Sequence, residues 1–269
     1  MAKIQIKKAI DVILLDFPRI VKPDSFKDDI LIPFFKEFLP IYLKAHWGDI
    51  DLIDIIRQLR NESNLTQKQF SECPQIAPTT SEKEEIIESV LISVRWHLSM
   101  NMITPPIMRL MACIWTEGYK KGFIKTEIYA DVLPALENWH NLGLKVFSLS
   151  SSPVFEQKTL MTYSKFGNIH HFIDMYLDLN FGAKNHSATY IKLARFAHTD
   201  PNKVLFITDF EANAKAASAA GVRVILVVRN ANANANSEFV SIGTLTDIEF
   251  THSSIASGSS LGSREKRAP

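Results

Sequence analysis

Four short runs of mostly apolar residues stand out along the chain, and none shows the alternation typical of a strand with one exposed face. They lie at residues 11–16, 144–152, 203–210 and 222–228. Such runs are typical of parallel strands that are covered on both faces. Apolar residues recur at helical spacing at residues 131–143, 187–197 and 211–221. This alternation of strands and helices predicts an α/β fold with a doubly wound parallel sheet.

The stretch from residue 24 to residue 122 has a different pattern. It shows no convincing strand, and helices are expected at residues 30–44, 51–60, 81–97 and 106–119. We therefore predict that a helical insert, residues 24–122, interrupts an α/β core domain formed by residues 9–23 and 123–245. Residues 246–269 are rich in Ser and Gly, which predicts a disordered tail. The Asn-rich run at residues 230–237 predicts a surface loop.

The composition of the chain excludes several classes of protein. The chain has 269 residues, of which 46% are hydrophobic and 22% charged, so it can bury a sizeable core. Lys and Arg total 30 against 29 Asp and Glu, and the net charge of +1 predicts neither a nucleic-acid nor a membrane partner. Two cysteines exclude a disulfide framework. We recognise no signal peptide, so we expect the protein in the cytoplasm, with the nucleus as the alternative. We also expect it to be a monomer.

Polar side chains gather where the predicted strands end. They are Asp16, Ser150 with Ser151, Thr208 with Asp209, and Lys184 shortly before a predicted helix. Ligands of doubly wound sheets bind beyond the carboxyl ends of the strands, so these groups are expected at one edge. Two carboxylates, a hydroxyl and an ammonium suit phosphoryl transfer through an aspartyl-phosphate. The alternative for a single strand-terminal Asp is that it caps the next helix.

Several segments carry a resemblance to a known family. They are ILLD ending at Asp16, SFKDDILIPFFKEFLPIYLKAHW at 25–47, ADVLPALENW at 130–139, SSSPVFEQK at 150–158, FGAK at 181–184 and VLFITDFEANAKAASAAG at 204–221. Their order resembles the haloacid-dehalogenase superfamily, and within it the enolase-phosphatases of methionine salvage. The resemblance spans about residues 12–241 and implies a core domain whose helical cap closes over the substrate. The implied substrate is a small phosphorylated metabolite, a diketo-methylthiopentyl phosphate.

The resemblance also implies roles for individual residues. Asp16 would be the nucleophile and a Mg²⁺ ligand, and Asp209 would hold the same ion. Ser150, helped by Ser151, would bind the phosphate, and Lys184 would pair with the phosphoryl group during catalysis. The implied cofactor is therefore Mg²⁺, a hard cation that prefers oxygen ligands.

The loop after Asp16 departs from the family pattern. Pro18 stands where the family has its general acid and base, although its carbonyl could still serve as the expected metal ligand; losing such a group typically slows a reaction by about 10²–10⁴-fold. Arg19 replaces a glycine, and Ile20 replaces a threonine. Asn213 replaces the second acid of the metal motif, which weakens cation binding. Two alternatives follow: a phosphatase of weakened activity, or an inactive paralog that uses the inherited pocket as a binding or regulatory protein.

Overall fold

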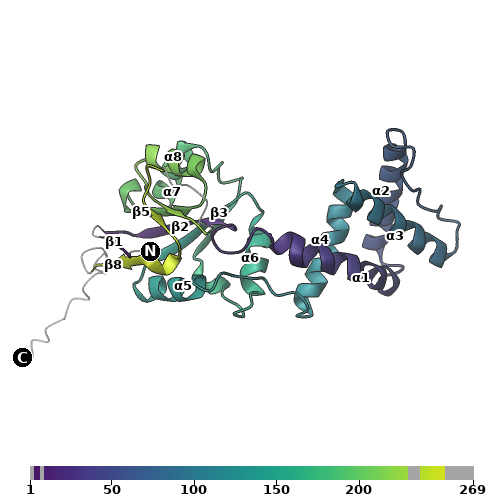
Figure 1. Ribbon diagram of the computed structural model, residues 1–269, viewed down its shortest axis with the longest axis horizontal. Coiled ribbons are helices and arrows are strands. Elements are labelled where there is room, and N and C mark those ends of the chain that lie inside the picture. Colours follow the sequence, from purple (N-terminus) through teal and green to yellow (C-terminus); the bar gives the residue numbers. More distant parts are fainter. Residues whose placement is uncertain (1–2, 7–8, 230–236, 252–269) are drawn as a thin grey trace, which may run out of the picture. The chain divides into compact units, whose positions relative to one another are not determined.

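The computed structural model describes residues 3–6, 9–229 and 237–251. The chain divides into two compact units, which we describe separately (Figure 1). The core unit comprises Met1–Asp24 and Thr126–Pro269, and the cap unit comprises Ser25–Lys125. The cap unit thus occupies much the same stretch as the helical insert expected at residues 24–122.

A parallel sheet forms the centre of the core unit. Among the described residues it has six strands in the order β4-β3-β2-β5-β6-β7. The strands are β2 (Val12–Phe17), β3 (Lys145–Ser150), β4 (Met175–Leu177), β5 (Val204–Thr208), β6 (Arg223–Val227) and β7 (Ser241–Ile242). All six residues of β2 are buried, and β2 pairs with β3 on one side and β5 on the other. The predicted α/β fold with a doubly wound parallel sheet is confirmed.

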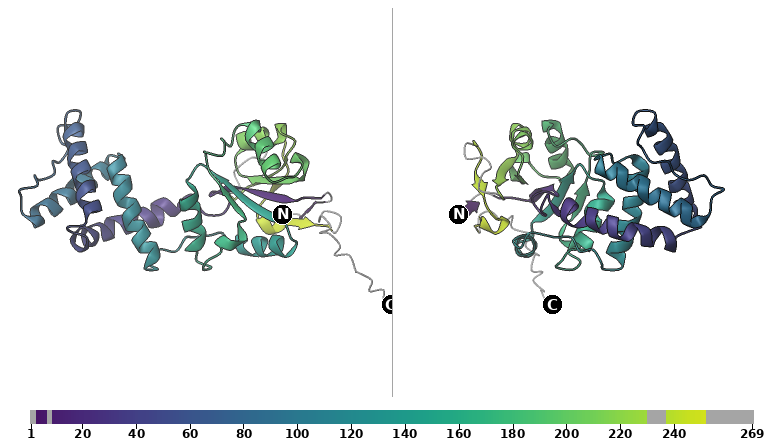
Figure 2. Two further views of the ribbon diagram at one scale, coloured as in Figure 1. Left: turned by 180° about the vertical axis from the view of Figure 1, so that it is seen from behind. Right: turned by 45° about the vertical axis from the view of Figure 1, so that its right-hand side comes forward.

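Helices cover both faces of this sheet. Figures 1 and 2 show α5 and α6 on one face and α7 and α8 on the other. The core-unit helices are α5 (Val132–Asn141), α6 (Val154–Thr162), η2 (His170–Phe172), α7 (Ser187–Phe196), η3 (Pro201–Lys203), α8 (Glu211–Ala219) and η4 (Leu245–Asp247). Trp139 of α5 is fully buried against one face, and Tyr190 of α7 is fully buried against the other. Each face therefore has its own apolar core.

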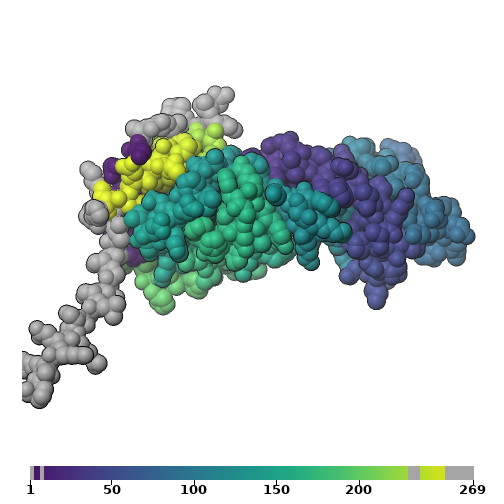
Figure 3. Space-filling view, turned by 90° about the horizontal axis from the view of Figure 1, so that it is seen from below, coloured from purple at the N-terminus to yellow at the C-terminus, as the bar shows by residue number. Residues whose placement is uncertain are grey.

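The beginning and the later part of the chain pair with each other. Strands β1 (Ile4–Ile6) and β8 (Ile248–Phe250) form a parallel pair, and Figure 3 shows the purple N-terminal surface beside the yellow C-terminal segment. The predicted tail, residues 246–269, is therefore wrong over its first residues. The side chains of Leu245 and Ile248 are buried. The prediction of a tail is based on the Ser-rich composition of the residues that follow them. Residues 252–269, and most of the expected loop at 230–237, lie outside the described residues.

The cap unit is built from helices joined by loops, the longest of which runs from residue 68 to residue 82. Its elements are η1 (Lys27–Leu31), α1 (Ile32–Ala45), α2 (Ile50–Gln67), α3 (Lys83–Ser99) and α4 (Pro105–Lys120). Buried side chains from α1 to α4, among them Phe35, Ile55, Val90 and Leu110, form a single apolar cluster. None of the described helices is both long and apolar enough to cross a membrane.

His46 links the end of α1 to other parts of the cap unit. Its Nδ1 lies 2.7 Å from Asp49 Oδ2, and its Nε2 lies 2.9 Å from Glu117 Oε2 on α4. The hydrogen bond to Asp49 and then that to Glu117 raise the pKa of His46, while partial burial opposes them. Protonated His46 therefore stabilises the folded cap below its ordinary pKa near 6.5, and this contribution is lost as the pH rises through the raised value.

We expect NMR titration of the imidazole protons to give His46 a pKa above 6.5. Glu117→Gln should lower that pKa because it removes one of the two carboxylates. Glu88→Gln removes an exposed carboxylate from α3 and serves as the control. A His46 pKa at or below 6.5, or one that Glu117→Gln does not lower, would contradict this account of the link.

Candidate active site

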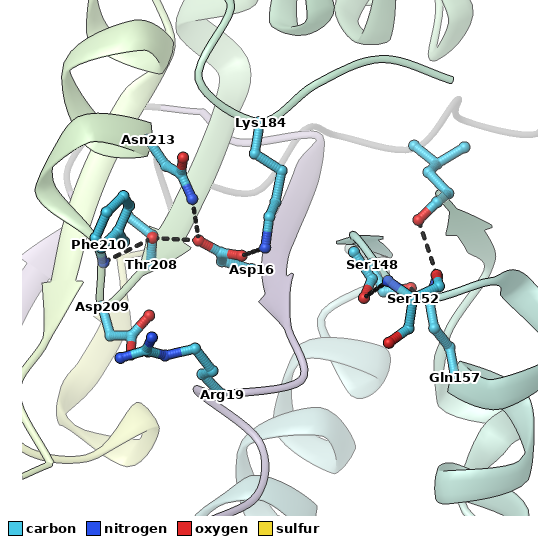
Figure 4. A network of polar contacts seen from close by, with 12 residues as sticks. Asp16, Arg19, Ser148, Ser152, Gln157, Lys184, Thr208, Asp209, Phe210 and Asn213 are labelled. Carbon is cyan, nitrogen blue, oxygen red and sulfur yellow. Dashed lines mark hydrogen bonds and ion pairs between the residues drawn. The ribbon is translucent and has the colours of Figure 1, made fainter. Parts of the chain in front are cut away.

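Asp16 is a buried carboxylate near the carboxyl end of the central strand β2. Its residue is 3% exposed, and both of its oxygens accept hydrogen bonds (Figure 4). Lys184 Nζ lies 2.6 Å from Oδ1, while the Thr208 hydroxyl and the Asn213 amide, at 2.9 Å, donate to Oδ2. Burying a carboxylate is costly unless it is paired and hydrogen-bonded, and these donors supply both conditions. The carboxylate is consequently held in one orientation.

The position of Lys184 depends on helix α7, which begins shortly after it. The Tyr190 hydroxyl donates to the carbonyl oxygen of Lys184 at 2.5 Å, and the Tyr190 side chain is fully buried. Burial, and secondarily the charge of Asp16, raise the pKa of Tyr190, so its hydroxyl remains a donor at ordinary pH. The contact fixes the backbone from which the ammonium reaches Asp16.

A second acidic group, Asp209, follows β5. Its Oδ2 accepts a hydrogen bond of 2.8 Å from Arg19 Nε (Figure 4). Its Oδ1 is buried and has no hydrogen-bond partner among the described residues. Burial raises the pKa of Asp209, as does the neighbouring charge of Asp16, whereas Arg19 acts in the opposite direction.

The loop after β3 carries the predicted phosphate-binding serines. Ser150 is fully buried, and its hydroxyl accepts the backbone N–H of Ser152 at 3.0 Å. Gln157 of α6 accepts from the Ser148 hydroxyl at 2.7 Å and donates to the Ser152 carbonyl at 3.0 Å. It also donates to the carbonyl of Leu177 at 3.0 Å. Gln157 therefore anchors this loop to the sheet.

A pocket of about 400 Å³ in the core unit collects most of the predicted residues. Its walls are formed by Asp16, Arg19, Ser151, Leu179, Ala183, Lys184, Asn185, Asp209, Phe210 and Asn213. Asp16, Lys184, Ser151 and Asp209 thus come together as the sequence suggested. Ser150 does not line the pocket, and its role in binding phosphate stays a prediction. The pocket offers two carboxylates and two cations to a ligand.

The oxygen atoms implied as Mg²⁺ ligands, on Asp16, Pro18 and Asp209, do not suit this ion, which requires near-octahedral coordination by oxygen. Pro18 does not line the pocket. Both oxygens of Asp16 already accept hydrogen bonds, and the Pro18 carbonyl accepts the N–H groups of Val21 and Lys22 at 2.9 and 3.0 Å. Arg19 donates a hydrogen bond to Asp209 Oδ2. Of the oxygen atoms implied as metal ligands, only Asp209 Oδ1 therefore lacks a hydrogen-bond partner among the described residues. In the described part of the chain, no three His, Cys, Asp or Glu residues are grouped to hold a metal.

Known proteins with similar sequences show the family to which the chain belongs. It is 35% identical to an enolase-phosphatase E1 of Danio rerio over 220 residues, which cover 81% of this chain and 84% of the relative. The protein of the same name from Salmo salar is 33% identical over the same shares of the two chains. The chain belongs to the enolase-phosphatase E1 family. No model of a protein family matches the sequence.

Solved structures show the fold that this family member shares with others. The UTR4 protein of Saccharomyces cerevisiae aligns with a TM-score of 0.67 at 23% identity, over 88% of this chain and 98% of the yeast protein. The L-2-haloacid dehalogenase RSc1362 aligns with a TM-score of 0.51 at 12% identity, over 89% and 97% of the two chains. The core unit and the helical insert thus belong to a haloacid-dehalogenase-like architecture.

Gln157 was not identified as important from the sequence, although it lies in the SSSPVFEQK segment that supports the family resemblance. Its replacement by Leu leaves the buried hydroxyl of Ser148 and the buried carbonyl of Leu177 without this partner, as well as the partly buried carbonyl of Ser152. Each unsatisfied buried group costs about 1–3 kcal/mol, and two of these groups are buried, so Gln157→Leu should lower the free energy of unfolding by at least about 2 kcal/mol.

Urea unfolding followed by circular dichroism measures this loss. The control is Gln67→Leu, which replaces an exposed glutamine at the end of α2 and should change stability by less than about 0.5 kcal/mol. Equal stabilities of the two variants would show that Gln157 does not anchor the loop.

Proposed function

We propose that the protein is a phosphoric monoester hydrolase of the enolase-phosphatase type, acting on a diketo-methylthiopentyl phosphate in methionine salvage. The observation that supports this most directly is the contact between Asp16 and Lys184, 2.6 Å apart, in a pocket that Ser151 also lines. A nucleophile beside a cation is the arrangement that phosphoryl transfer to a carboxylate requires. The name shared by the relatives points to the same chemistry.

In the proposed reaction, an oxygen of Asp16 attacks the phosphorus atom, and the bond from phosphorus to the ester oxygen breaks. The electron pair of that bond leaves with the ester oxygen, which takes up a proton from water. Water then attacks the phosphorus of the aspartyl-phosphate, which releases inorganic phosphate and restores the carboxylate. Lys184 balances the negative charge on the phosphoryl oxygens. Its existing hydrogen bond to Asp16 places the ammonium where that charge develops.

Pro18 makes this reaction slow. Proline has no side-chain group that could protonate the leaving oxygen or activate the water. The loss of a positioned acid and base lowers a rate by about 10²–10⁴-fold. The Mg²⁺ requirement implied by the family resemblance stays a prediction, which the oxygen atoms of the pocket do not favour.

A second candidate function is that of an inactive paralog, a pseudophosphatase that binds a phosphorylated metabolite and acts as a regulatory protein. The hydrogen bonds on both oxygens of Asp16 favour it, because an attacking oxygen must first give up such a contact. The Arg19–Asp209 pair favours it too, since the pair fills part of the same pocket.

Phosphate release from a panel of small phosphomonoesters, with Mg²⁺ and with EDTA, distinguishes the two functions. We expect slow release that falls at least about 100-fold in Asp16→Asn, since the amide is a poor nucleophile. Asp11→Asn serves as the control, because Asp11 lies just before β2, at the end of the strand away from the pocket, and pairs with Lys203. A wild-type rate in Asp16→Asn would overturn the mechanism. No release above that of folded Asp16→Asn would favour the binding protein.

Restoring an acid at position 18 tests the reason for slow turnover. We expect Pro18→Glu to hydrolyse phosphomonoesters about 10²-fold faster than Pro18→Gln, which has the same size without the acid. Steady-state kinetics of the two variants gives this ratio directly. Equal rates would mean that the missing acid does not limit the reaction.

A further inference from the structure

Arg19 is the unexpected charge of the candidate site. Its guanidinium belongs to the loop after β2, and Nε lies 2.8 Å from Asp209 Oδ2. A second nitrogen, Nη2, lies 3.6 Å from a carboxylate oxygen of Asp24. The side chain of Arg19 is 51% exposed, whereas that of Asp209 is 17% exposed. The arginine therefore reaches from solvent onto an inner carboxylate.

The charges of the pocket balance without any bound ion. Asp16 and Asp209 carry the negative charges, and Lys184 and Arg19 each lie within ion-pair distance of one of them. A guanidinium remains positively charged at every pH at which the protein is folded, and it satisfies a carboxylate by directed hydrogen bonds. A dication that bound both oxygens of Asp209 would have to displace this group from Oδ2.

Asn213 also weakens the attraction of the pocket for a divalent cation. It stands where the family resemblance places a second metal-binding acid, and it donates its amide nitrogen to Asp16 at 2.9 Å. A neutral amide at position 213 and a positive guanidinium at position 19 both weaken the attraction of a divalent cation. The Pro18 carbonyl, which accepts backbone N–H groups, does not compensate for this loss.

We propose that Arg19 replaces the divalent cation at this site, so that the pocket binds a phosphomonoester dianion on Arg19 and Lys184 without Mg²⁺. Both cations line the same pocket, and a phosphate that enters it meets them together. Guanidinium groups suit phosphate because their N–H groups match its oxygens. The inference rests on the proposed use of the pocket for phosphomonoesters, but its first test measures cation binding alone.

Calorimetric titration with Mg²⁺ in the absence of phosphate provides that test. We expect Arg19→Ala to bind Mg²⁺ at least about tenfold more tightly than the wild type, because it frees Asp209 Oδ2 and removes a positive charge. Arg19→Lys retains the charge and should resemble the wild type. Arg57→Ala removes an exposed guanidinium that pairs with Asp54 in the cap unit and serves as the control. Affinities of Arg19→Ala and wild type within about threefold would overturn the proposal.

Titration with inorganic phosphate gives a second readout. The wild type should bind phosphate equally in EDTA and in Mg²⁺, whereas Arg19→Ala should bind weakly in EDTA and recover in Mg²⁺. A wild type that needs Mg²⁺ to bind phosphate would refute the replacement. Absence of phosphate binding in every protein would refute the proposed function instead, and the Mg²⁺ titration would still decide the role of Arg19.

Discussion

The buried carboxylate of Asp16 is the constraint around which the rest of the pocket is arranged. A charge at 3% exposure is stable only where donors replace the water that it has lost. The donors come from separate parts of the chain: Lys184 before α7, Thr208 at the end of β5, and Asn213 in α8. The hydrogen bonds to this one carboxylate therefore fix a loop, a strand end and a helix relative to one another.

The contacts of Asp16 suit both the hydrolysis and the binding of a phosphomonoester. The contacts that hold Asp16 in one orientation are the contacts that an attacking oxygen of this residue would have to exchange for phosphorus. Lys184 can make that exchange easily, since an ammonium has three donors and can turn toward a phosphoryl oxygen. The Thr208 and Asn213 donors remain on the other oxygen and hold the carboxylate during the exchange. The difference between the two functions thus depends on the loop at Pro18 more than on Asp16.

The sequence predicted the parts of the fold that have strong local signals. Strands β2, β3, β5 and β6 are continuous apolar runs, and the helices α1 to α4 have clear periodicity. Strands β4 and β7 have three and two residues, too few for a pattern to emerge. Strand β8 was mistaken for tail because its pairing with β1 joins residues about 240 positions apart, and such a contact leaves no local trace. Helix α6 was not predicted because only two of its residues, Gln157 and Met161, are buried, which is too few to give an apolar pattern at helical spacing.

The sequence predicted some features of the candidate site and missed others. Asp16, Ser151, Lys184 and Asp209 could be grouped from the sequence because parallel strands bring their ends to one edge. The sequence did not show that Ser150 is fully buried and does not line the pocket, or that its hydroxyl accepts the backbone N–H of Ser152. Nor did it show that the Tyr190 hydroxyl holds the carbonyl of Lys184, because that contact depends on the course of the loop before α7. The contact of Arg19 with Asp209 joins segments far apart in the chain, so it leaves no local signal either.

The pairing of β1 with β8 has a consequence for shortened forms of the chain. Each strand gives the other its hydrogen-bonding partner, from Ile4 with Ile248 to Ile6 with Phe250. A protease cut, or a stop codon, just after residue 245 would remove β8 and leave the backbone of β1 unpaired. Ile4 and Ile6 pack against the apolar cluster that contains Ile248, so the beginning of the shortened chain would also lose part of its apolar support. The short strand β8 thus holds the beginning of the chain in place.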